Sequence, residues 1–361
     1  MMAWFRDEPF LKISRGGQWV VLLIVSALAV ILLERAHLPA ALMLGPMVAG
    51  ILLETGGGNL RVPSALYRMS QAVIGCLVAR AISSEIVSTF AAHWPLFLGT
   101  MFSVIAASCA LGWAISKSGI LPDAIAVWGL LPGAASVMML MADARGTDGR
   151  LVAFMQYLRV VLVAIAAAVI ARVFYHTGYH GTASNWFPPI HWGMFSKTLG
   201  FIILSIVLGR KSGIPAGVLL VPLVLGTVLH IAGLLTIELP PWFLALSYAL
   251  LGWNTGLRFT RNILAHAARA LPQIFLSVLL LMAFCGGIGV VLVKIAGIDP
   301  LTAYLATTPG GLDSAAIIAA STKVNMPFVM AMQTTRLLIV LMIGPALARM
   351  VARLVIQKNA C

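Results

Sequence analysis

The sequence predicts an all-α polytopic membrane protein made of two inverted repeats, each with about five transmembrane helices and one broken or re-entrant helix. Three observations carry this prediction. Hydrophobic residues make up 61% of the 361 residues, while charged residues make up only 10%. Apolar runs recur from end to end at the length that a helix needs to cross about 30 Å of hydrocarbon. A pattern of proline, glycine, glutamine and arginine occurs twice with one spacing.

The low charge content excludes a soluble domain, in which about a quarter of the residues are charged. The mean hydropathy of +1.00 agrees with this. The period-two alternation of an outer-membrane barrel is missing, so the spans are predicted as helices. The predicted spans are 19–33, 39–53, 64–79, 95–115, the broken segment 121–141, 151–174, 198–209, 215–235, 242–257, 272–293, the broken segment 301–320 and 327–347.

The apolar runs fall into two groups on either side of a polar and aromatic linker. The linker has the aromatic composition of a membrane–water interface, with Trp186, Phe187 and Trp192. The expected organisation is a cytoplasmic N-terminal lead (1–18), a first membrane repeat (19–175), the linker (176–197), a second membrane repeat (198–350) and a cytoplasmic tail (351–361).

The repeated motif places a helix breaker inside one apolar run and a glutamine–arginine pair in the next. Pro132-Gly133 is followed by Gln156 and Arg159, and Pro309-Gly310 is followed by Gln333 and Arg336, with all four matches at one offset in the numbering. Residues at i and i+3 share one helix face, so each copy presents an amide beside a guanidinium. A charge inside a membrane span is a functional hypothesis by default.

Prolines and glycines elsewhere indicate that the chain is duplicated. At an offset of 176, Pro39, Pro46 and Gly50 match Pro215, Pro222 and Gly226. At an offset of 177, which is also that of the repeated motif, further residues match: Pro63, Ser70, Gly75, Pro95 and Gly112 match Pro240, Ser247, Gly252, Pro272 and Gly289. Most of these residue types fix backbone shape, and shared apolar composition alone would not align them.

Loop charge favours inverted halves, because cytoplasmic loops concentrate Lys and Arg. With a cytoplasmic N-terminus and neither Pro-Gly segment crossing, 16 Lys and Arg, Lys117 among them, face the cytoplasm and 6 face outside. If both broken segments cross, the split is 12 against 10. The six outside residues in the first arrangement are Arg35, Arg80, Arg172, Lys197, Lys294 and Lys323. That arrangement has five crossings per half, and an odd number inverts the repeats.

The broken helices are the predicted binding site. A helix that restarts after a break exposes amide donors at its positive dipole end, ready for an anion. Each arginine could hold that anion or act as a structural tie to a backbone carbonyl. Asp313, whose counterpart in the first repeat is Ser136, could carry protons or pair with Arg336. The candidate substrate-binding residues are Gln156, Arg159, Gln333, Arg336, Gly133, Gly310, Gly311 and Asp313.

These residues resemble the AbrB family of bacterial membrane proteins. The resemblance rests on Pro309-Gly310-Gly311 with Gln333 and Arg336, and on the weaker echo Pro132-Gly133 with Gln156 and Arg159, and it covers 38–350. It implies two copies of a hydrophobic region in the bacterial inner membrane. Members are named as regulators of gene expression or as ammonia monooxygenases, and the family is grouped with inverted-repeat secondary transporters. The paired-Asp ion site of those transporters is missing here, which leaves the coupling ion open.

The function expected from these features is secondary transport of a small solute, for which an anion is one candidate. A membrane-embedded sensor that affects gene expression indirectly is the alternative. A metal monooxygenase would need the linker histidines His176, His180 and His191 as ligands, but no carboxylates accompany them, and we favour interface histidines. We therefore expect no enzyme activity, no cofactor and no metal. The expected partners are the bilayer and the solute, and a homo-oligomer is compatible with the sequence.

Net charge +13 raises the question of nucleic-acid binding. The excess of Lys and Arg is what cytoplasmic loops of membrane proteins acquire. The longest stretch without a span, 173–197, is too short to fold into a DNA-binding domain. We expect no direct nucleic-acid partner.

Overall fold

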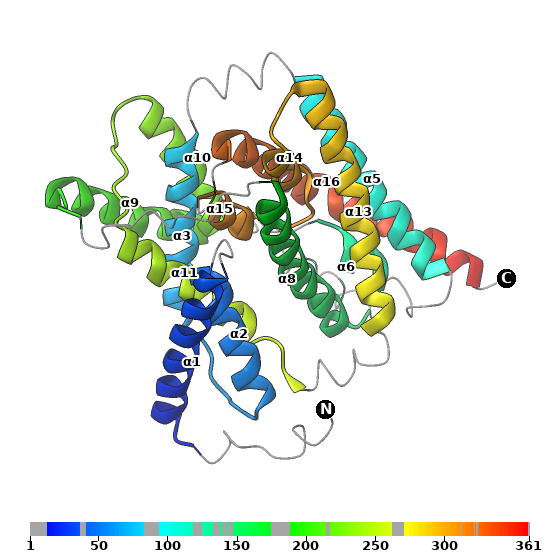
Figure 1. The fold of residues 1–361 in the computed structure, drawn as a ribbon. Helices are drawn as coiled ribbons and strands as arrows, with labels where there is room; N and C mark the ends of the chain where they lie inside the picture. Colours follow the sequence, from blue (N-terminus) through cyan, green and yellow to red (C-terminus); the bar gives the residue numbers. More distant parts are fainter. Residues whose placement is uncertain are drawn as a thin grey trace. The chain divides into compact units, whose positions relative to one another are not determined.

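The computed structural model describes residues 13–36, 41–82, 94–117, 125–132, 138, 142, 147–174, 188–213, 217–261, 271–310, 312–320, 322 and 324–359. All regular secondary structure in these ranges is helical (Figure 1). The chain divides into two compact units, and each repeat contributes to both. Unit 1 comprises Met1–Ser84 and Tyr175–Arg261, and unit 2 comprises Glu85–Phe174 and Asn262–Cys361.

Unit 1 contains the first three described helices of each repeat. From the first repeat these are α1 (Arg15–Arg35), α2 (Ala41–Thr55) and α3 (Ser64–Ala81), and from the second they are α9 (Trp192–Lys211), α10 (Gly217–Ile231) and α11 (Pro241–Gly256). The duplication is visible in these bounds, because α2 and α10 begin and end at the offset that relates Pro46 to Pro222. The spacing inferred from prolines and glycines therefore also governs the helices.

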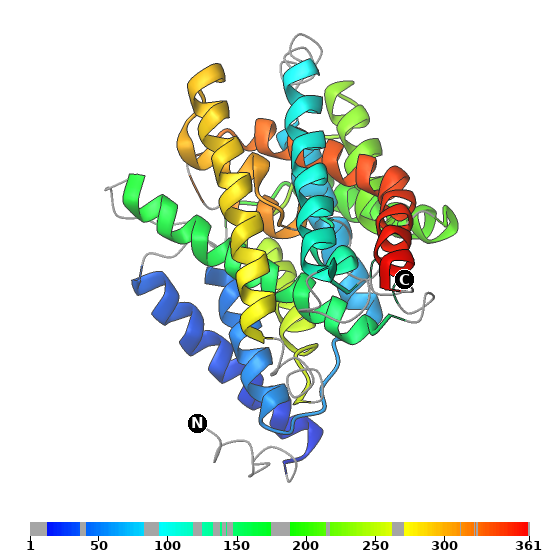
Figure 2. The ribbon, with the colours of Figure 1, turned by 90° about the vertical axis from the view of Figure 1, so that its right-hand side faces the viewer.

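Unit 2 contains the remaining helices. They are α5 (Trp94–Lys117), α6 (Ile125–Leu130), α8 (Gly149–Phe174), α13 (Leu271–Ala296), α14 (Pro300–Thr307), α15 (Leu312–Ala320) and α16 (Met326–Asn359). Helices α5 and α13 occupy equivalent places in the two repeats, since their first residues are related by the offset that matches Pro95 with Pro272. Figures 1 and 2 show these two helices running in opposite directions.

Glycines bring the helices of unit 1 together, and they do so reciprocally between the repeats. A Cβ at Gly75 of α3 would lie 2.5 Å from the carbonyl oxygen of Leu219 and 2.7 Å from Pro222 of α10. Gly252 of α11, the counterpart of Gly75, faces Met43 and Pro46 of α2, the counterparts of Leu219 and Pro222. Small residues let membrane helices approach backbone to backbone. Each repeat thus holds the other by the same contact.

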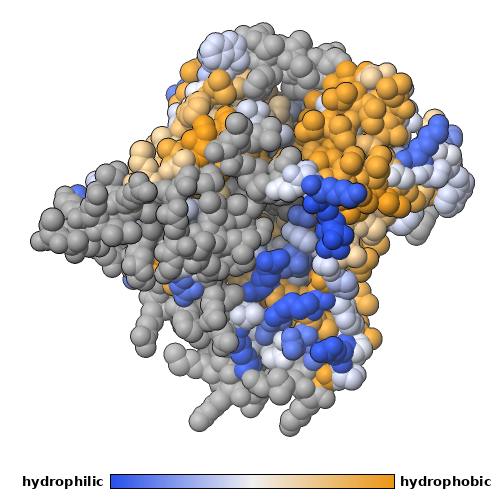
Figure 3. Space-filling view, turned by 180° about the vertical axis from the view of Figure 1, so that it is seen from behind, coloured by the Kyte–Doolittle hydropathy of each residue, from blue (hydrophilic) through white to orange (hydrophobic). Residues whose placement is uncertain are grey.

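Among the described residues, four helices are long and apolar enough to cross a membrane. They are Arg15–Arg35, Phe97–Lys117, Trp192–Lys211 and Leu271–Ala296. Large apolar side chains on α1 point outward, with Leu28 56% and Leu32 67% exposed. Figure 3 shows hydrophobic residues gathered over a broad part of one face. A soluble protein rarely exposes such a surface, so the described helices have the length and the exposed apolar side chains expected of a helical membrane protein.

Helix lengths differ from the predicted spans in two ways. Helix α9 begins at Trp192 and α16 continues to Asn359, beyond the expected ends at 198 and 347. The predicted spans stopped where polar or aromatic side chains begin, but backbone hydrogen bonds continue a helix through such residues. Helices α2 and α10, by contrast, have only 15 residues each, fewer than the roughly 20 that cross a bilayer untilted.

The break predicted in the second repeat is confirmed, and local chemistry explains it. The carboxylate of Asp299 caps α14 by accepting from the amides of Leu301 and Thr302 at 3.1 and 3.0 Å. Helix α14 ends at Thr307, shortly before Pro309, and α15 starts at Leu312. Proline lacks an amide donor and disfavours the helical conformation in the residue before it. In the first repeat α6 likewise ends at Leu130, before Pro132.

Candidate functional site

The glutamine and arginine of the first repeat hold the end of its own broken helix. Gln156 Nε2 donates to the carbonyl oxygens of Trp128 and Leu131, at 3.1 Å each. Arg159 Nη1 donates to the carbonyls of Leu130 and Leu131 at 3.3 and 3.2 Å, and its Nη2 donates to Gln156 Oε1 at 2.6 Å. The last carbonyls of a helix have no intrahelical partner, so these donors cap the C-terminal end of α6. We call this arrangement the first clamp.

The second repeat contains the same arrangement, which we call the second clamp. Gln333 Nε2 donates to the carbonyls of Leu305 and Thr308 at 2.5 and 3.3 Å. Arg336 donates through Nη1 to the Thr308 carbonyl, and through Nη2 to the Gly310 carbonyl at 2.7 Å and to Gln333 Oε1. Leu305 and Thr308 are the counterparts of Trp128 and Leu131, at the offset that relates the two arginines. The repeated motif therefore specifies one polar structure, built twice.

Both arginines are buried, with side chains 1% and 5% exposed for Arg159 and Arg336. Neither forms an ion pair with any acidic side chain in the described ranges. In each guanidinium the Nε donor has no hydrogen-bond partner there. Carbonyl oxygens satisfy donors but do not neutralise a full positive charge, so neither guanidinium has its charge compensated by a described side chain.

The two clamps lie in one electrostatic environment. The charge of the Arg336 guanidinium interacts with the charge of Arg159, and both charges interact with the thiol of Cys285 in α13. The Tyr304 hydroxyl of α14 donates to the Val163 carbonyl of α8 at 3.5 Å, which connects the broken helix of one repeat to the arginine helix of the other. A ligand that neutralised one guanidinium would therefore also affect the other.

The remaining predicted residues differ in how far the structure describes them. Gly310 belongs to the second clamp through its carbonyl oxygen. Asp313 stands in the first turn of α15, and its side chain is not among those described. Gly133 and Gly311 lie outside the described residues. The structure thus brings together Gln156 with Arg159, and Gln333 with Arg336 and Gly310.

Sequence reasoning missed the partners of these side chains. It treated a tie to a backbone carbonyl as one of two interpretations for each arginine, and this tie is present in both clamps. The acceptors are main-chain oxygens, which carry no sequence signal. In both repeats the glutamine follows the residues just before the Pro-Gly pair by the same number of positions. This constant separation in the sequence was a usable signal.

Metal binding has little support in the described part of the chain. No group of three or more His, Cys, Asp or Glu there could hold a metal ion. His176 and His180 of the monooxygenase alternative lie outside the described residues. His191 is the N-cap residue of α9, and its backbone amide donates to Glu238 Oε1 at 3.1 Å.

Comparison with known proteins identifies the family. The family described as "Transition state regulatory protein AbrB" matches residues 42–352, which begin after α1 and include both clamps. The chain belongs to the AbrB family. One relative, from Escherichia coli strain K12, is named "Putative regulator AbrB". It is 41% identical over 347 residues, which cover 95% of this chain and 99% of the relative.

A more distant relative comes from Bacillus subtilis strain 168 and is named "Uncharacterized protein YhjN". It is 23% identical over 381 residues, covering 98% of this chain and 95% of its own length. Both relatives therefore share the full two-repeat length. The word regulator belongs to the name of the Escherichia coli protein and describes no residue of the clamps.

Proposed function

We propose that this AbrB-family protein is a secondary transporter of a small anionic solute in the bacterial inner membrane, and not an enzyme. The observation that carries the proposal is the pair of buried, uncompensated guanidiniums, each with a free Nε donor among the described residues. Placing one guanidinium in a membrane interior costs about 2.5–3.5 kcal/mol on insertion scales. A bound anion would recover part of this by accepting charge-assisted hydrogen bonds.

The proposed site is the region that Arg336 shares with the start of α15. Helix α15 begins directly after the break, so its first amides lie at a positive dipole end. Arginine presents planar, paired donors that match carboxylate and phosphate oxygens. The substrate class we propose is therefore a small carboxylate or phosphate, held by Arg336 with Gly310, Gly311 and Asp313 nearby in the sequence. Arg159 contributes charge from the first clamp.

The proposed architecture is a pair of inverted repeats with both termini in the cytoplasm. The opposite directions of the equivalent helices α5 and α13 support inversion, as does the excess of Lys and Arg on one side in the loop-charge count. In transporters of inverted repeats, substrate sites lie near the bilayer midplane and are formed by discontinuous helices. The broken helix α14–α15 beside the second clamp fits that description.

An anion screen followed by a flux measurement tests the proposal. Purified protein in detergent would be heated with inorganic phosphate, sulfate, and simple mono- and dicarboxylates at one ionic strength. Any stabilising anion would then be offered, radiolabelled, to proteoliposomes loaded with the unlabelled compound. We expect saturable exchange by the wild-type protein. Arg336→Lys should insert and fold but lose most exchange, because lysine keeps the charge and loses the planar paired donors.

Two outcomes would count against transport of an anion. Stabilisation without exchange in proteoliposomes would favour a sensor, the alternative that the relative's name supports. Equal stabilisation of wild-type protein and Arg336→Gln by the same anion would remove Arg336 from the binding site. Direct regulation of a promoter would instead appear as a sequence-specific footprint at physiological salt, whereas we expect only weak, salt-sensitive DNA binding.

A further inference from the structure

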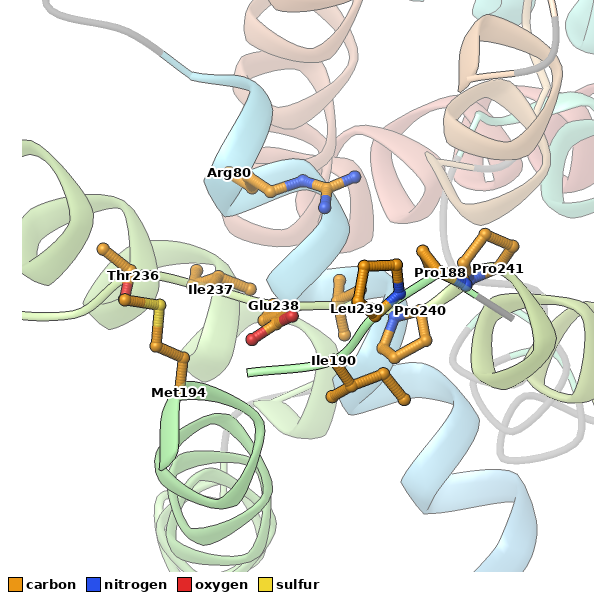
Figure 4. A pocket seen from close by; sticks show the side chains of 11 residues that line it. Arg80, Pro188, Ile190, Met194, Thr236, Ile237, Glu238, Leu239, Pro240 and Pro241 are labelled. Atoms are coloured by element: carbon orange, nitrogen blue, oxygen red, sulfur yellow. The ribbon is translucent and has the colours of Figure 1, made fainter. Parts of the chain in front are cut away.

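A pocket of about 300 Å³ lies within unit 1, whereas both clamps belong to unit 2. Its walls come from the end of α3, the chain leading into α9, and the segment 236–241 that leads into α11 (Figure 4). In Figure 4, Arg80 extends from α3 above that segment, which carries Glu238. The polar lining residues are Arg80, Thr236 and Glu238, and apolar ones include Ile190 and Met194.

The two charged residues of this pocket have opposite charges, and neither has a charged partner in the described part of the chain. Arg80 is exposed and makes no hydrogen bond or ion pair in the described part of the chain. Glu238 Oε1 accepts from the His191 amide at 3.1 Å, but its Oε2 is buried without a partner among the described residues. Arg80 and Glu238 do not pair with each other although both line one pocket. A buried carboxylate oxygen without a donor calls for an explanation.

The pocket lies at the end of a membrane span. Helix α9, one of the four candidate spans, begins at Trp192, whose side chain is 72% exposed. Trp192, Phe195, Trp242 and Phe243 form a chain of edge-to-face and tilted ring contacts with centroids 5.6–6.3 Å apart. Exposed aromatic side chains at a span end mark the level of the lipid headgroups. A ligand at this depth meets both water and lipid.

We propose that this pocket binds a zwitterion of the phosphoethanolamine type, with its phosphate at Arg80 and its ammonium at Glu238 Oε2. A purely anionic ligand would leave the buried carboxylate oxygen without a donor, and a cation would leave Arg80 unpaired. A ligand with both charges satisfies both groups at once. The chemistry occurs in the headgroup of phosphatidylethanolamine and in free phosphoethanolamine. The site is independent of the transport proposal, because none of its residues belongs to a clamp.

Two charge-removing variants and one control test the site. Glu238→Gln removes the charge but keeps an amide oxygen that can accept from the His191 amide, so the α9 cap is preserved. Arg80→Gln alters an exposed residue and should fold normally. Arg35→Gln removes an exposed arginine at the end of α1, outside the pocket lining, and serves as the control.

The measurement is thermal unfolding of each purified protein, together with lipid counting by native mass spectrometry. The additives are phosphatidylethanolamine, phosphatidylglycerol and phosphatidylcholine of equal chain length, and free phosphoethanolamine. We expect phosphatidylethanolamine to bind and stabilise the wild-type protein and Arg35→Gln most. Each pocket variant should bind it about tenfold more weakly, since a hydrogen bond to a charged group is lost.

Comparing the additives distinguishes a lipid headgroup from free phosphoethanolamine as the ligand. Stabilisation by free phosphoethanolamine that both pocket variants abolish would support the site with a soluble ligand in place of a lipid. An equal response of wild-type protein and both pocket variants to phosphatidylethanolamine would overturn the proposal. So would a preference for phosphatidylglycerol that depends on Arg80 alone, because Glu238 would then have no role.

Discussion

The two units differ in how the repeats make their main contacts. In unit 1 each repeat contacts the other, through Gly75 against α10 and Gly252 against α2, and these contacts are between tightly packed backbones. In unit 2 each repeat holds its own broken helix, through Gln156 with Arg159 and through Gln333 with Arg336, and these contacts are polar and charged. Close apolar packing tolerates little rearrangement. Unit 1 is therefore suited to a rigid support, and unit 2 to ligand recognition.

The two clamps within unit 2 also differ from each other. Arg159 donates to Leu130 and Leu131, within the helix end, whereas Arg336 reaches Thr308 and then Gly310, beyond the proline. After its proline, the second repeat has two consecutive glycines and Asp313, where the first repeat has one glycine and Ser136. Duplication kept the clamp and changed its surroundings. We therefore expect the first clamp to be mainly structural and the second clamp to bind ligand as well.

The largest expected effect is an all-or-none difference in labelling between equivalent positions. Lys117 is the last residue of α5, its counterpart Lys294 lies in the last turn of the equivalent helix α13, and both are exposed. If the repeats are inverted, a membrane-impermeant maleimide added to intact cells should label Lys294→Cys and leave Lys117→Cys unlabelled, in a background without native cysteines. Permeabilised cells should give labelling of both.

A second equivalent pair serves as the control for the labelling result. Arg35→Cys at the end of α1 should react from outside, and Lys211→Cys at the end of α9 only after permeabilisation. Reaction of both members of either pair from the same side would show parallel repeats. The two broken helices would then enter the membrane from one leaflet, and a shared site near the midplane would be lost.

The next effect compares the clamps by removing each arginine. Arg159→Gln leaves the Leu130 carbonyl without its side-chain donor and Arg336→Gln leaves the Gly310 carbonyl without its own, at about 1–3 kcal/mol each, while the glutamines still donate to Leu131 and Thr308. We expect both variants to lose stability to a similar degree. Anion affinity should fall by about 10–100-fold in Arg336→Gln and by much less in Arg159→Gln. Thermal unfolding across a series of anion concentrations separates the two quantities.

Equal loss of anion affinity in the two variants would mean that the two clamps bind the anion as a symmetric pair. The different residues after Pro132 and Pro309 would then have no effect on binding. Unchanged affinity in a folded Arg336→Gln protein would leave the backbone tie as the whole role of that residue.

These comparisons also show how far the sequence could be interpreted. The positions of Pro132 and Pro309, and of the glutamine–arginine pairs, were enough to predict a duplication and a break, since proline and buried charge act through local chemistry. The division of each repeat between two units was not predictable. Helices of similar hydrophobicity do not reveal their neighbours, and the contact of Gly75 with Leu219 depends on backbone shape at both residues.

For each contact of the candidate site, the sequence could predict the side chain that donates but not the backbone carbonyl that accepts. Arginine and glutamine have distinctive chemistry, but the carbonyls of Leu131 and Thr308 that they bind would be the same for any residue type. The pocket of unit 1 gave no signal for a related reason. Arg80 and Glu238 belong to different repeats, and nothing in the spacing connects them before the chain folds.

A smaller effect tests the rigid contacts of unit 1. Gly75→Leu and Gly252→Leu both place atoms where backbone of a neighbouring helix lies, and overpacking of this kind costs about 1–3 kcal/mol or more. Because the contacts are reciprocal, we expect similar losses of thermal stability in the two variants, with anion affinity unchanged. Gly200→Leu in α9, which has open space around it, is the matched control and should be near neutral. A loss of affinity in Gly252→Leu alone would mean that unit 1 takes part in binding.

The smallest effect concerns a hydroxyl that connects the repeats within unit 2. Tyr304 donates to the Val163 carbonyl at 3.5 Å, the outer limit of a hydrogen bond, so Tyr304→Phe should lower the unfolding free energy by less than about 1 kcal/mol. The informative quantity is its coupling to the first clamp, measured by combining Tyr304→Phe with Arg159→Gln. If the clamps act separately, the two losses should add to within about 0.5 kcal/mol. A coupling above about 1 kcal/mol would show that the broken helix of the second repeat responds to the arginine of the first, and the clamps would then have to be treated as one site.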